Sequence, residues 1–88
     1  MHSRQHQQHV DNLRKIAKGY TEFNGRQVTQ AFKSVGCKVT KPQDLLKIKF
    51  AQSSIQIIDT DAEKMIIGHP ENALSQFARR VLEHYDNN

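Results

Sequence analysis

The apolar residues of this chain change their spacing twice, and this change constrains the fold more than any other feature. In residues 10–35 and 73–85 they recur every three or four positions, as on one face of a helix. In residues 46–50 they alternate with lysines, as in a half-buried strand. Helical segments on both sides of a strand-rich centre predict an α+β domain, and 88 residues suffice for one domain with a small core.

Two helices are predicted before the strands. The first begins at Val10 and stops near Gly19, and the second ends at Gly36, because glycine tolerates the left-handed conformation that often follows a helix. Between them, Asn24-Gly25 predicts a tight turn. The longest apolar stripe, over residues 73–85, predicts a C-terminal helix.

Strands are predicted between the second and the last helix. They form an antiparallel β-meander, so that the complete order is ααβββα with the last helix on the inner face of the sheet. An alternative stays open for residues 41–50, because Thr40 followed by Gln43 is a capping box that would open a helix and give a winged helix-turn-helix. The strict alternation of lysines and apolar residues favours the strand. The three predicted strands are residues 46–50, 55–58 and 64–67.

Strand register decides which side chains face the core. Phe50 opposite Ile55 would place Ile48 opposite Ile57, and Ile57 would also face Ile67 in the second hairpin. Either the N-terminal helix covers the outward isoleucines of this arrangement, or they form an apolar patch flanked by lysines. The outward residues are Lys47, Lys49, Gln56, Ile58 and Ile66.

The polar ends of the chain are expected to lie outside the folded core. We predict a flexible tail over residues 1–9, a single domain over 10–85 and a short tail over 86–88. The predicted core is Leu13, Ile16, Val28, Phe32, Val35, Leu46, Ile48, Phe50, Ile55, Ile57, Ile67, Leu74, Phe77, Ala78, Val81 and Leu82.

The cysteine content and the hydropathy of the chain limit its location. Cys37 is a single cysteine, so it forms no internal disulfide, which favours a reducing compartment. The N-terminus does not resemble a secretory signal, and no apolar stretch approaches the roughly 18 residues that a membrane span needs. We therefore expect a cytoplasmic protein without a membrane partner.

Three clusters carry weak signals for metal binding or catalysis, and we expect none of these activities. The histidines at positions 2, 6 and 9 would share a helix face, but they have no acidic or thiolate partner. The acids at 59, 61 and 63 resemble the start of a calcium loop, yet Lys64 stands where that loop needs glycine. Cys37 beside Lys38 lacks the surroundings typical of a thiol enzyme.

Charge divides the chain into a basic and an acidic part. Residues 1–50 carry ten Lys/Arg and three Asp/Glu, a formal +7, and residues 51–88 carry three and six, a formal −3. Such a basic surface favours a polyanionic partner, and Tyr20 and Phe23 would be able to stack on bases if exposed. The candidate phosphate-binding residues are Arg14, Lys15, Lys18, Arg26, Lys33, Lys38, Lys41, Lys47 and Lys49.

These observations predict a small non-catalytic module that binds nucleic acid, DNA or RNA, through phosphate contacts without strong base specificity and without a cofactor. No sequence signature of a known nucleic-acid-binding motif accompanies the basic residues. The alternative is a protein-interaction or assembly adaptor that uses Ile58 and Ile66 on the outer face of the sheet, with a homodimer as one form.

Overall fold

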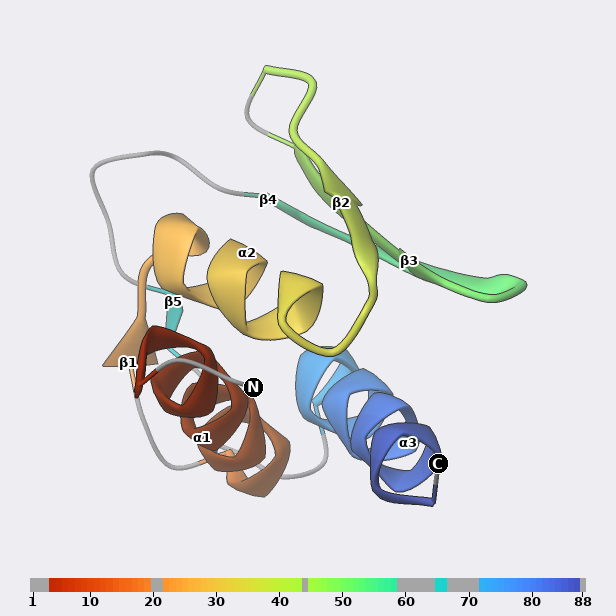
Figure 1. Cartoon of the computed structure of the whole chain (residues 1–88). Coiled ribbons are helices and arrows are strands. Elements are labelled where there is room, and N and C mark those ends of the chain that lie inside the picture. The colour runs from red at the N-terminus through yellow and green to blue at the C-terminus, as the bar shows by residue number, and fades with distance from the viewer. Residues whose placement is uncertain (1–3, 20–21, 44, 59–64, 67–71, 88) are drawn as a thin grey trace.

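The computed structural model describes residues 4–19, 22–43, 45–58, 65–66 and 72–87. These residues form an α+β arrangement in which two helices precede a three-stranded antiparallel sheet and a third helix follows it (Figure 1). The predicted class and this order are confirmed. The helices are α1 (Arg4–Lys18), α2 (Gly25–Lys33) and α3 (Ala73–Asp86), and the strands are β1 (Glu22–Phe23), β2 (Lys38–Thr40), β3 (Leu45–Phe50), β4 (Ser53–Ile58) and β5 (Met65–Ile66).

The three-stranded sheet has β3 at its centre, with β2 and β4 on either side. The meander is therefore present, but its members differ from the prediction: residues 38–40 supply its first strand, and β5 pairs with β1 in a separate sheet. Phe23 of β1 is 3% exposed, so burial of this ring holds β1 at the core beside β5. A strand of two residues has too little apolar pattern to specify its partner from sequence.

Residues 41–50 contain a strand, as the alternation predicted, and the winged-helix alternative is not confirmed. The strand β3 occupies Leu45–Phe50. The edge strand β2 ends at Thr40, two residues before Pro42, so the proline does not interrupt a hydrogen-bonded ladder.

The hairpin of β3 and β4 has a shorter turn than predicted. Residues 51–52 alone join the strands, so Phe50 lies opposite Ser53, and the predicted pairing of Phe50 with Ile55 is wrong by two residues. A shift of two leaves each side chain on its predicted face, because side chains alternate with a period of two. Ile55 therefore still packs against the core.

The core lies between the helices and the inner face of the sheet. Phe50, Ile55 and Ile57 are half-buried against it, and Ile67 lies outside the described residues. The other predicted core residues are buried, which confirms the helical stripes and the inward face of β3. Among the described residues, five buried hydrophobic residues were not in the prediction: Val10, Ala17, Phe23, Ala31 and Cys37.

The first helix extends further toward the N-terminus than predicted. It begins at Arg4 rather than at Val10, and His6 Nε2 lies 3.4 Å from the Tyr85 hydroxyl of α3. Part of the segment predicted as a tail is thus helical and packs on α3. At the other end, Asp86 is the last residue of α3, so it belongs to the helix.

Local side chains fix the start of α2. The Asn24 side chain accepts a hydrogen bond from the Gln27 amide at 2.8 Å, and the Gln27 side chain accepts one from the Asn24 amide at 3.0 Å. This is a capping box, so Asn24 is an N-cap and Gly25 is the first helical residue. The predicted Asn24-Gly25 turn is wrong, and the Asn-x-x-Gln spacing was the signal that identifies the cap.

The helices lie on one side of the three-stranded sheet (Figure 1). Helix α1 packs against both α2 and α3, while α2 contacts β2 and β3, and α3 contacts β4. Among the described elements, no helix covers the opposite face of this sheet. Lys47 and Lys49 alternate with the buried residues of β3 and are accordingly exposed.

Candidate nucleic-acid interface

The uncovered face of the three-stranded sheet is built by strand register. Lys38 of β2 lies opposite Lys49 of β3, and Lys49 lies opposite Ser54 of β4. Two residues earlier in β3, Lys47 lies opposite Thr40 of β2 and opposite Gln56 of β4. We call this exposed surface the lysine face; its two rows are Lys38–Lys49–Ser54 and Thr40–Lys47–Gln56.

The spacing of the lysine face concentrates positive charge. Neighbouring strands lie about 4.8 Å apart, and residues two apart in a strand are separated by about 6.7 Å. Three ammonium groups thus share a small area with the hydroxyl and amide groups of the three neutral residues. Among the described residues of this face there is no carboxylate. The face is therefore chemically suited to bind oxyanions.

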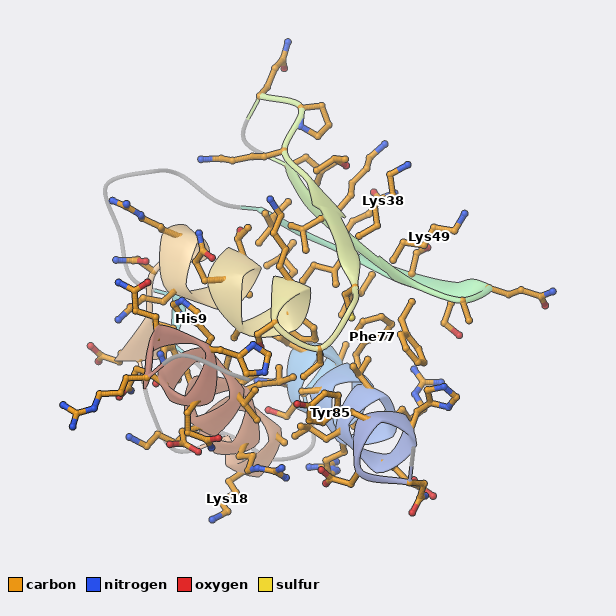
Figure 2. The ribbon with its side chains drawn as sticks, in the orientation of Figure 1. His9, Lys18, Lys38, Lys49, Phe77 and Tyr85 are labelled. Atoms are coloured by element: carbon orange, nitrogen blue, oxygen red, sulfur yellow. The ribbon has the colours of Figure 1, made fainter. Side chains whose placement is uncertain are left out.

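The other basic residues do not converge on the lysine face. Figure 2 shows Lys38 and Lys49 projecting from the sheet away from the helices, whereas Lys18 projects from the far end of α1. Lys15 and Lys18 are exposed on α1, and Arg26 and Lys33 are exposed on α2. The nine predicted phosphate-binding residues are thus distributed over separate parts of the surface.

Arg14, one of the predicted basic residues, is paired with a carboxylate. Its guanidinium donates two hydrogen bonds to the Asp86 carboxylate, at 3.0 and 2.9 Å. The hydrogen bond from Arg14 lowers the pKa of Asp86, and the same bond raises the pKa of Arg14. This pair joins the basic part of the sequence to the acidic part, so their charges offset one another between α1 and α3.

Residues of α3 add further charges to the helical side. Arg79, which is exposed, donates a hydrogen bond to the Ala17 carbonyl at 2.9 Å and so binds the C-terminal end of α1. Arg80 and Glu83 are exposed on the same helix. Basic and acidic side chains therefore interleave on the helical side, in contrast to the lysine face.

Lys41 follows β2 directly and is exposed. It lies beyond the two rows, beside the strand that carries Lys38, so it is a neighbour of the lysine face rather than a member.

The two isoleucines predicted for a protein interface lie in different sheets. Ile58 lies opposite Leu45 in the three-stranded sheet, whereas Ile66 lies opposite Glu22 in the two-stranded sheet. The expectation that both isoleucines share one sheet face is wrong, because β5 pairs with β1.

The structure gives no support to stacking by Phe23, because this ring is 3% exposed. Tyr20 lies outside the described residues. Phe50 faces inward and packs edge-to-face against His84, with ring centroids 5.1 Å apart. None of the described aromatic residues belongs to the rows of the lysine face.

Cys37 is 6% exposed, and burial raises the pKa of its thiol to about 11, so it is protonated at neutral pH. His2 and residues 59–63 lie outside the described residues. Within the described part of the chain, no three His, Cys, Asp or Glu side chains are grouped so that they would hold a metal ion.

None of the described helices is long and apolar enough to cross a membrane.

Comparisons of the chain with protein-family models, with curated proteins and with solved structures found no match.

The sequence predicted only part of the lysine face. Alternation along 46–50 identified Lys47 and Lys49 as outward residues, and Gln56 was placed on the same face. Thr40 and Ser54 were missed, and Lys38 was not assigned to this face, because their position depends on the pairing of β2 and on the two-residue turn.

Proposed function

We propose that this protein is a non-catalytic nucleic-acid-binding module whose lysine face contacts the phosphate backbone. The observation that carries the proposal is the alignment of Lys38, Lys47 and Lys49 on one exposed sheet face. In this proposal the interface is smaller than the set of nine phosphate-binding residues predicted from the sequence, because Arg14 is paired with Asp86 and the other predicted residues of the helices lie elsewhere.

Phosphate contacts explain the expected mode of binding. Each lysine that neutralises a phosphate releases condensed counterions, which provides affinity for any sequence. Thr40, Ser54 and Gln56 supply donors that hydrogen-bond to phosphate or sugar oxygens. This chemistry positions a backbone and reads no base edge, so binding is weak and non-specific, with a Kd of about 10⁻⁴–10⁻⁶ M at physiological salt.

Salt dependence provides the first test. Fluorescence anisotropy with labelled mixed-sequence duplex DNA and RNA oligonucleotides measures Kd between 50 and roughly 200 mM salt, a range over which phosphate contacts weaken steeply. Three lysine contacts predict a slope of log K against log salt of about −2.7 for duplex DNA, from −0.9 per contact. A slope near zero, or no binding to any of the oligonucleotides, would contradict the proposal.

Charge reversal locates the interface. The variant Lys47→Glu/Lys49→Glu should lose at least tenfold in affinity and reduce the slope by about 2, one for each lost phosphate contact. The matched control Lys15→Glu/Lys18→Glu changes the net charge by the same amount on α1 and should retain binding within about threefold, since long-range steering alone is affected. Circular dichroism verifies that both variants fold. Equal losses in the two variants would show that total charge, rather than the lysine face, determines binding.

A further inference from the structure

Strand β4 lies at the edge of the three-stranded sheet and pairs, among the described strands, only with β3. An edge strand presents unpaired backbone N–H and C=O groups that are able to pair with another strand. Natural proteins commonly protect such edges with proline, charged side chains, bulges or very short strands. The six residues of β4, Ser-Ser-Ile-Gln-Ile-Ile, contain no proline, glycine or charge.

The opposite edge of the sheet has these protections. Strand β2 has three residues, carries the exposed Lys38, and is followed by Lys41 and Pro42. Two β2 edges brought together would place lysines beside lysines. The charges of the two edges thus disfavour association through β2 and permit it through β4.

The inward-facing residues of β4 are less buried than those of the neighbouring strand β3. On β3, Leu46 is 1% exposed and Ile48 is 0% exposed. Their cross-strand partners on β4, Ile57 and Ile55, are only half-buried, although α3 packs against this strand. Apolar surface therefore continues to the edge, where an added strand would bury it further.

We propose that β4 pairs antiparallel with β4 of a second copy of this chain. A two-fold axis through Gln56 places Gln56 opposite Gln56 of the second copy, and Ile55 opposite Ile57 of the second copy. Residues of the same parity then face each other, so both sheets keep their inner faces on one side. The strand is neutral, so this pairing opposes no like charges within β4.

Closure of the contact favours pairing of β4 with itself over a head-to-tail arrangement of copies. Contact of β4 with β2 of another copy would be heterologous and would continue into open arrays, whereas the contact of β4 with itself closes at two chains. A pair of six-residue strands is small compared with the roughly 1,200–2,000 Å² of stable interfaces. The dimer is therefore weak and forms at high protein concentration.

Sedimentation velocity without nucleic acid, at roughly physiological ionic strength where the Debye length is about 8 Å, tests this pairing. The weight-average mass should rise toward that of a dimer over a concentration series that extends to the millimolar range. In Gln56→Lys, two lysines meet on the two-fold axis beside Lys47 of each copy, so association should weaken at least tenfold. The matched control Thr40→Lys adds the same charge in the same row at the β2 edge, and it should dimerise like the wild type.

Hydrogen exchange gives an independent measurement on the unmodified chain. Backbone amides of β4 that point away from β3 should become protected as the protein concentration rises. A mass that stays monomeric throughout the series would overturn the inference. So would a dimer that Gln56→Lys leaves unchanged, or one that Thr40→Lys weakens equally, because the contact would then lie elsewhere or respond only to net charge.

Discussion

Replacing Lys38 with glutamate should stabilise the fold while it weakens nucleic-acid binding. Lys38 lies directly opposite Lys49 in the sheet, and both side chains are exposed. Like charges in directly opposed positions of a sheet are destabilising, and an opposite-charge pair is stabilising. A surface selected for stability alone would avoid this arrangement, whereas a phosphate between the two lysines would stabilise it.

The magnitude follows from the pairing geometry. Opposed residues have Cβ atoms about 5 Å apart, and their flexible side chains hold the charges roughly 7 Å apart. Two such charges in water repel by about 0.6 kcal/mol, and screening at 0.15 M salt reduces this to about 0.25 kcal/mol. Lys38→Glu replaces repulsion with attraction of similar size. The free energy of unfolding should therefore increase by about 1 kcal/mol at low salt and by about 0.5 kcal/mol at 0.15 M.

Thermal unfolding at several salt concentrations measures this effect. A gain of 0.5 kcal/mol raises Tm by roughly 2–4 °C in a domain of this size. Lys38→Gln removes the repulsion without adding attraction, so it should show about half the gain. The slope of log K against log salt for nucleic acid should become less steep by about 1 in both variants, since one phosphate contact is lost. A lower Tm for Lys38→Glu, or an increase in Tm that does not depend on salt, would refute the repulsion assigned to Lys38 and Lys49.

Three further predictions concern the hairpin turn and the buried thiol. Ala51 has a φ of 54°, in the left-handed region that favours glycine, so Ala51→Gly should raise the free energy of unfolding by about 0.5–1 kcal/mol in chemical denaturation; a destabilised variant would contradict this. Cys37, with its pKa raised to about 11, should react with iodoacetamide at pH 8 far more slowly in the native protein than in denaturant, and native labelling at the rate of a free thiol would show that it is not buried. Because the native state holds this proton more tightly than the unfolded state does, stability should be unaffected below about pH 9 and should decrease as the pH rises toward 11.

The helices and the central strand were predictable because their signals are local. Apolar residues at helical spacing predict the buried face of α1, which includes Leu13 and Ile16. The same spacing predicts the buried face of α3, which includes Phe77 and Val81. Alternation in β3 predicted that Ile48 faces inward and that its lysine neighbours face outward. The capping box of Asn24 is also a local signal, carried by the Asn-x-x-Gln spacing, although the Asn24-Gly25 pair by itself predicts a turn.

The partners of the strands were not predictable in the same way. Lys-Val-Thr in β2 has one apolar residue, so its pattern does not distinguish a strand from a loop. The two residues of β5 carry too little pattern to indicate that they pair with β1 rather than with the three-stranded sheet. The Arg14–Asp86 pair joins residues 72 positions apart, which no local spacing indicates.

The sequence by itself determined the α+β class, the buried faces of the helices and the outward direction of Lys47 and Lys49. These features follow from the periodicity of apolar residues, which depends only on near neighbours in the chain. The tertiary structure decided that Lys38 joins these lysines, that Arg14 is paired with Asp86, and that Ile58 and Ile66 lie in different sheets. Such pairings depend on how the whole core packs, because strands distant in sequence are matched by collective burial rather than by their own residues.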